Sequence, residues 1–79
     1  MNDHLTSLLA EVFGLREVDI RPDLNKSDIG SWDSLKQMDL VMSLEREYGI
    51  VLEIPDILKM TSIRAIIDVL TDKGINLAD

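Results

Sequence analysis

The stretch that most constrains the fold is residues 33–49, where a helical pattern starts at a capping residue and ends at a glycine. Apolar residues recur at helical spacing from Leu35 onward, and no Gly or Pro interrupts them before Gly49. Asp33 is a natural N-cap, because its carboxylate accepts hydrogen bonds from free N–H groups of the first turn. Ser34 then takes the first helical position with its hydroxyl near solvent. A negatively charged substituent on Ser34 would be stabilised there by the helix dipole.

A long segment without a regular period, residues 15–32, separates this helix from an expected first helix over residues 3–13. Single-sided apolar spacing predicts the first helix, and Gly14 supplies its stop. A loop of this length is unusual in so small a domain unless it is held against the core. The apolar residues expected to hold it are Leu15, Val18, Ile20, Leu24 and Ile29.

After Gly49, alternating apolar residues predict an extended anchor over residues 50–54, and a short helix is expected over residues 55–59 because Pro suits a first turn. Thr61 or Ser62 caps a last helix, and the residues after its stop at Gly74 are expected to fray. The side chains expected to point inward here are Leu52, Ile57, Leu58, Met60, Ile63, Ile66, Ile67 and Leu70. We therefore expect residues 1–79 to form one all-α domain, a small four-helix bundle of three longer helices and one short helix.

Charge and cysteine content exclude several function classes. The net charge of −7 argues against nucleic acid and anionic membrane surfaces as partners and favours basic protein patches. Without cysteine the chain has no disulfide, no thiolate metal site and no thiol nucleophile. A calcium-like start at Asp23-x-Asn25-x-Ser27 is rejected because Asp28 stands where such a loop requires glycine, so no metal is expected. No signal peptide or membrane-length apolar run is present, so a cytoplasmic location is expected.

The run Gly30-x-x-Asp33-Ser34-Leu35, followed by Leu40-Val41-Met42-x-Leu44-Glu45-x-Glu47-Tyr48, resembles the acyl carrier proteins. In that family the serine of Asp-Ser-Leu carries 4′-phosphopantetheine. The resemblance therefore implies this cofactor bound covalently to Ser34, with Asp33 helping a phosphopantetheinyl transferase to recognise the site. It also implies the family's helical fold and a carrier that catalyses nothing. Acyl intermediates would be held as thioesters on the imported thiol, and other enzymes would process them.

The expected second helix carries two apolar arcs when its residues are placed at 100° steps. Leu40, Val41, Leu44 and Tyr48 are assigned to the core, whereas the other arc flanks Ser34 and is either core beneath the long loop or an exposed docking strip. The resemblance implies the docking role, and the expected partner-binding residues are Leu35, Met38, Asp39, Met42 and Glu45. The expected partners of this monomeric carrier are the transferase and acyl-loading and acyl-processing enzymes with basic docking patches. An acyl pocket is expected between the second and third helices, lined by Leu44, Leu52, Ile57, Met60 and Ile67.

Several alternatives stay open at this level. The acyl carrier could serve fatty acid synthesis or a specialised lipid or polyketide-type synthesis, and Lys36 and Arg46 make its second helix less uniformly acidic than that of fatty-acid carriers. A peptidyl or aminoacyl carrier is a second possibility, and an unmodified helical adaptor is a third. A hydrolase with Ser34 as nucleophile is rejected, because the chain has one His and no Gly-x-Ser-x-Gly turn.

Overall fold

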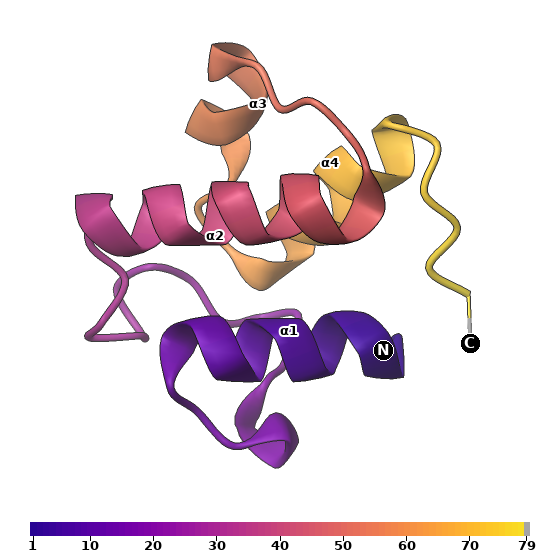
Figure 1. The fold of residues 1–79 in the computed structure, drawn as a ribbon. Coiled ribbons are helices and arrows are strands. Elements are labelled where there is room, and N and C mark those ends of the chain that lie inside the picture. Colours follow the sequence, from indigo (N-terminus) through magenta and orange to yellow (C-terminus); the bar gives the residue numbers. More distant parts are fainter. Residues whose placement is uncertain (79) are drawn as a thin grey trace.

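The structure, a computed structural model, describes residues 1–78 and forms a bundle of four α-helices with no strand among those residues. The elements in chain order are α1 (Asp3–Phe13), the 3₁₀ turn η1 (Glu17–Asp19), α2 (Ser34–Tyr48), α3 (Ile54–Lys59) and α4 (Ile63–Asp72). Helices α1 and α2 run side by side in opposite directions, and α3 lies on the other side of α2 (Figure 1). The predicted helical bundle is confirmed, with α1 and α2 at the predicted boundaries.

Capping groups set the helix ends, as their local chemistry predicts. Helices α1 and α2 end at Gly14 and Gly49, whose φ angles of 68° and 63° lie in the left-handed region that residues with a Cβ rarely adopt. Ser62, one of the two predicted caps, begins α4, and its Oγ accepts the Ala65 N–H at 3.0 Å. These contacts satisfy backbone groups that would otherwise lack partners at helix ends.

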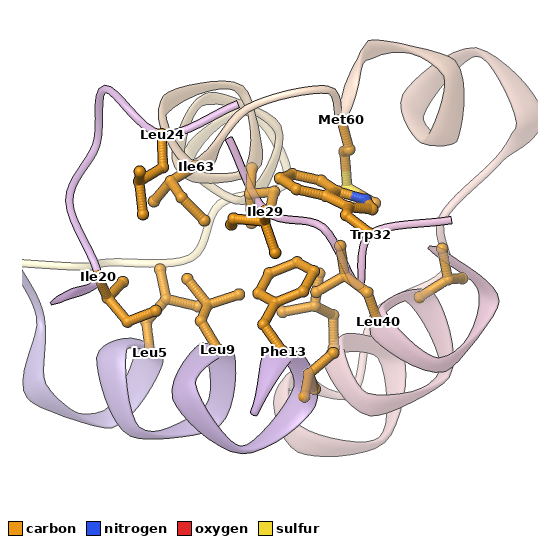
Figure 2. Packing of buried hydrophobic residues seen from close by; sticks show 14 of the residues in the cluster. Leu5, Leu9, Phe13, Ile20, Leu24, Ile29, Trp32, Leu40, Met60 and Ile63 are labelled. Atoms are coloured by element: carbon orange, nitrogen blue, oxygen red, sulfur yellow. The ribbon is translucent and has the colours of Figure 1, made fainter. Parts of the chain in front are cut away.

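The core is one cluster of apolar side chains from all three longer helices, the long loop and the residues that flank α3 (Figure 2). Its largest fully buried members are Leu5, Leu9, Leu40, Leu44, Met60, Ile63, Ile66 and Leu70. Two aromatic rings extend it, because Trp32 lies against Phe13 with ring centroids 4.6 Å apart. The predicted core residue Tyr48 is only partly buried, but its ring packs against this cluster.

The long loop is held against the core, as predicted, by the side chains of Ile20, Leu24 and Ile29, with Leu15 partly buried. The loop also closes the N-terminal end of α4. The carbonyl of Leu24 accepts the Ile63 N–H at 2.9 Å, and that of Pro22 accepts the Arg64 N–H at 3.0 Å. Both N–H groups belong to the first turn of α4, which has no acceptor of its own for them. The loop therefore fixes the position of α4 as well as covering the core.

The prediction that Val18 anchors the loop is wrong, because its side chain is exposed on η1. The prediction that the extended anchor reaches Ile54 is wrong, and so is the prediction that Leu58 points inward, because both side chains are exposed. Glu53 and Asp56 form a reciprocal capping box, which starts α3 at Ile54 and carries that side chain into solvent. Leu58 follows the partly buried Ile57, and successive residues of a helix point about 100° apart.

The prediction of a frayed tail is wrong for the part that the structure describes. The Ile75 N–H donates to the Leu70 carbonyl at 3.0 Å, and the side chains of Ile75 and Leu77 pack against the core. Apolar residues in a tail remove surface from water when they fold back on a neighbouring helix. Asp79, the last residue of that prediction, lies outside the described residues.

Candidate functional site

Ser34 occupies the first position of α2, with its side chain exposed. The preceding residue is the N-cap, and Asp33 Oδ1 accepts the Lys36 N–H at 2.8 Å. The Asp33 carbonyl accepts the Gln37 N–H, also at 2.8 Å, which is the first intrahelical bond. Within residues 1–78 the Ser34 hydroxyl has no hydrogen-bond partner. A fixed backbone therefore presents a free hydroxyl to the outside.

The surroundings of Ser34 suit a phosphate ester. The N–H groups of Ser34 and Leu35 have no acceptor among residues 1–78, and they lie at the positive end of the α2 dipole. Lys36, two residues after Ser34, lines the depression beside it and adds an ammonium group, although its Nζ also lies 3.8 Å from Asp39 Oδ2. The site opens onto a shallow depression of about 420 Å³, lined by Ser31, Asp33, Leu35, Lys36 and Asp39. The donors and the open space fit a singly charged phosphodiester on an arm that extends into solvent.

Beside this site lies the apolar strip of α2, formed by Leu35, Met38 and Met42. Their side chains are 83%, 50% and 58% exposed. The structure therefore supports the interpretation of these residues as a surface strip and not as core beneath the loop. Asp39, another predicted partner residue, is also exposed.

The last predicted partner residue, Glu45, has an internal role in this structure. Its Oε2 accepts the Leu52 N–H at 2.8 Å, and the side chain is only partly exposed. This bond fixes the chain between α2 and α3. Glu45 is thus less available to a partner than Asp39.

The five residues predicted to line an acyl pocket form part of the packed interior. Leu44, Leu52 and Met60 are buried, whereas Ile57 and Ile67 are half-buried and pack against them. Neither the depression beside Ser34 nor a second one of about 400 Å³ between α1 and α2 includes any of the five. An acyl pocket here stays a prediction, because these side chains pack together in the interior.

Sequence reasoning missed Gln37 as a member of this region. The Trp32 indole Nε1 donates to Gln37 Oε1, and Gln37 Nε2 donates to the carbonyls of Ile57 at 3.1 Å and Met60 at 3.2 Å. Helical spacing held a signal for it, because Gln37 stands one turn before Leu40 on the buried side of α2. A polar residue at a core position predicts a buried hydrogen-bond network.

Fold and site together define a carrier domain that bears a phosphopantetheine arm. The family model described as the phosphopantetheine attachment site matches residues 3–70. A curated relative, acyl carrier protein 2 of Pseudomonas aeruginosa, is 38% identical over 66 residues, which are 82% of this chain and 82% of the relative. The chain belongs to the acyl carrier protein family.

A solved structure agrees with this assignment. The solution structure of a holo acyl carrier protein from Geobacter metallireducens superposes with a TM-score of 0.80 at 29% identity, over 91% of this chain and 83% of that one. The protein is accordingly a carrier in acyl biosynthesis, and not an enzyme, with covalently attached phosphopantetheine. Carriers of this family work with a phosphopantetheinyl transferase and with acyl-processing enzymes. No helix among residues 1–78 is both long and apolar enough to cross a membrane.

Proposed function

We propose that Ser34 is the residue that bears the arm, and that acyl intermediates of fatty acid or specialised lipid synthesis are carried there as thioesters. The observation that carries this proposal is the unpartnered, exposed hydroxyl at the first position of α2. Transfer from coenzyme A would form the bond from Ser34 Oγ to phosphorus and release 3′,5′-adenosine diphosphate and the hydroxyl proton. The bound group supplies a flexible thiol. The chain itself positions the hydroxyl, donates N–H groups to the phosphate and offers the surface that partners recognise.

Asp33 has two parts in this proposal. Its carboxylate accepts the Lys36 N–H and so fixes the first turn of α2. Its negative charge also lies next to the modified serine, where a transferase can recognise it. The charge also opposes a second negative group nearby, because like charges repel. The main role of Asp33 is therefore to hold the first turn of α2, and with it Ser34, in place, and its charge does not stabilise the phosphate.

The test is phosphopantetheinylation followed by the intact mass of the protein. The wild-type chain is incubated with coenzyme A, Mg²⁺ and a broad-specificity transferase, and a gain of one arm is expected. Ser34→Ala should show no gain. Ser31→Ala is the matched control, because Ser31 lines the same depression but its Oγ donates to the Phe13 carbonyl at 3.1 Å. It should gain one arm like the wild type. An increase in the mass of Ser34→Ala would show that the arm is attached to another residue. No increase for the wild type would favour an unmodified adaptor.

We also propose that the strip of Leu35, Met38 and Met42, together with the carboxylate of Asp39, docks partners with an apolar contact rimmed by basic side chains. Unbranched Met side chains adapt to more than one surface, and an exposed apolar strip next to a reactive group is typical of a docking site. The net charge of −7 favours basic partners.

A double variant, Met38→Gln with Met42→Gln, tests this surface. Both side chains keep their approximate length and both are exposed, so the fold should remain stable while modification by the transferase becomes slower. Arg64→Gln on the exposed side of α4 is the control and should be modified at the wild-type rate. Equal rates for all three proteins would show that the strip does not contact the transferase.

A further inference from the structure

A polar bridge crosses the interior between α2 and α3. It consists of the Trp32 indole, the Gln37 amide and the carbonyls of Ile57 and Met60, and we call it the Gln37 bridge. Gln37 is 9% exposed, and among residues 1–78 it is the only buried residue with a polar side chain. The bridge therefore ties the long loop and the start of α2 to the C-terminal end of α3.

The bridge stands between Ser34 and the apolar interior. Gln37 follows Ser34 by three residues, so both lie on one side of α2, and the buried Leu40, Val41 and Leu44 continue along the helix from Gln37. A chain that starts at Ser34 and turns inward between α2 and α3 meets the Gln37 amide first. Beyond it lie Leu44 and Met60, which are fully buried.

Helix α3 depends on contacts at its ends more than on a buried face. None of its six residues is fully buried, although Ile57 packs partly against the core. Its N-terminal end is held by the ion pair between Asp56 and Lys73, with Oδ2 and Nζ 2.8 Å apart. The Gln37 bridge holds the other end. Opening the space beneath α3 on the side of Ser34 therefore requires this bridge to break.

We propose that the Gln37 bridge is a gate that keeps linear alkyl chains out of the interior, so that this carrier presents short or polar acyl groups in solvent. The proposal rests on attachment of the arm to Ser34. An alkyl chain entering past Gln37 would separate the Trp32 N–H and the Met60 carbonyl from their partners and has no polar atom to replace them. Short or polar acyl groups carry little apolar surface and gain little from burial. The five predicted pocket residues form an acyl pocket only when the gate is open.

The test compares acetyl, butyryl and decanoyl groups, each loaded by the transferase from the corresponding acyl-coenzyme A. The proteins are the wild type, Gln37→Ser, whose side chain is too short to reach α3, and the control Lys59→Gln on the exposed side of α3. Intact mass confirms loading, and cleavage of the thioester by hydroxylamine reports how well solvent reaches it. The wild type and Lys59→Gln should react at one rate for all three groups. In Gln37→Ser the decanoyl thioester should react roughly tenfold more slowly than the acetyl thioester, since each buried methylene strengthens retention of the chain.

The outcomes separate the gate from the proposed function. Failure to load the wild type contradicts attachment to Ser34. Successful loading with a protected decanoyl thioester in the wild type overturns the gate, as does a Gln37→Ser variant that shows no dependence on chain length. Should Gln37→Ser fail to fold, the ¹³C-methyl NMR signal of Met60 in the wild type decides instead. It should not move between acetyl and decanoyl, and a shift that grows with chain length would refute the proposal.

Discussion

Replacing Gln37 with Met isolates what the Gln37 bridge contributes to stability. Met has nearly the same length and volume as Gln but lacks its amide, so packing changes little while the polar contacts disappear. In this variant the carbonyl of Ile57 still has one hydrogen-bond partner, because it accepts the Met60 N–H at 3.1 Å. The Trp32 N–H and the Met60 carbonyl lose their only partners among residues 1–78, and both contacts are buried.

The size of the effect follows from these two groups. Each buried polar group left without a partner costs about 1–3 kcal/mol, which makes about 2–6 kcal/mol for both. Burial of the Met thioether offsets part of this, so we expect a loss of about 2–3 kcal/mol in the free energy of unfolding. A domain of this size has only about 3–5 kcal/mol of net stability. The Tm should therefore fall by roughly 8–24 °C, at about 4–8 °C per kcal/mol.

The assay is urea and thermal unfolding followed by circular dichroism, in a cycle with Trp32→Phe. Phe lacks the indole N–H, so Gln37→Met leaves one unpaired group fewer in that background. The loss of unfolding free energy caused by Gln37→Met should then be about 0.5–3 kcal/mol smaller in the Trp32→Phe background than in the wild type. A Gln37→Met variant within about 0.5 kcal/mol of the wild type, the usual range for surface substitutions, would refute the reasoning. An identical cost in both backgrounds would show that Trp32 does not depend on Gln37.

Three further predictions concern other polar contacts of the fold. The hydrogen bond from Lys73 lowers the pKa of Asp56 below its ordinary value of 3.8, and the same contact raises the pKa of Lys73. A carboxyl with a lowered pKa stabilises the fold above its unfolded pKa and stops doing so as the pH falls through its folded pKa. The stability lost in Lys73→Met should therefore be constant near neutral pH and shrink steadily as the pH falls below about 3.8 in urea titrations, and a loss that does not shrink over that range would contradict the pair. The Tyr48 hydroxyl is buried without a partner among residues 1–78, and burial raises its pKa, so Tyr48→Phe should raise the Tm by about 4–8 °C, whereas a lower Tm would show that the hydroxyl is satisfied. Asp33→Asn keeps a capping oxygen and should unfold like the wild type, whereas Asp33→Ala should lose about 1 kcal/mol, and equal losses would exclude the cap.

Local chemistry was enough to predict the backbone of the site. The cap at Asp33, the helical spacing after it and the stop at Gly49 predicted α2 from Ser34 to Tyr48, and the structure has these boundaries. The first helix was predicted equally well from its apolar face and Gly14. These signals act over a few residues, because a cap or a left-handed glycine satisfies groups within one helical turn.

The exposure of individual side chains was harder to predict. Val18 and Ile54 were expected to anchor the chain and Leu58 to point inward, yet all three point to solvent. Ile75 packs inward from a tail expected to fray. An apolar residue in a short element can point either way, and neighbouring segments decide which side is covered. The strip of Leu35, Met38 and Met42 shows the same ambiguity, because its helical spacing is compatible with either core or surface. Only the structure shows that the long loop does not cover it.

What the sequence determined by itself is the carrier family, the helix that begins at Ser34 and the chemistry that the exposed hydroxyl can accept. Only the tertiary structure decided how the apolar interior beside Ser34 is closed. Gln37 meets Trp32 five residues away, but it also meets the carbonyls of Ile57 and Met60, which are 20 and 23 residues away. In the sequence alone, Gln37 looks like any other polar residue in a helix. Its partners become apparent only when the fold brings distant backbone carbonyls within hydrogen-bond distance.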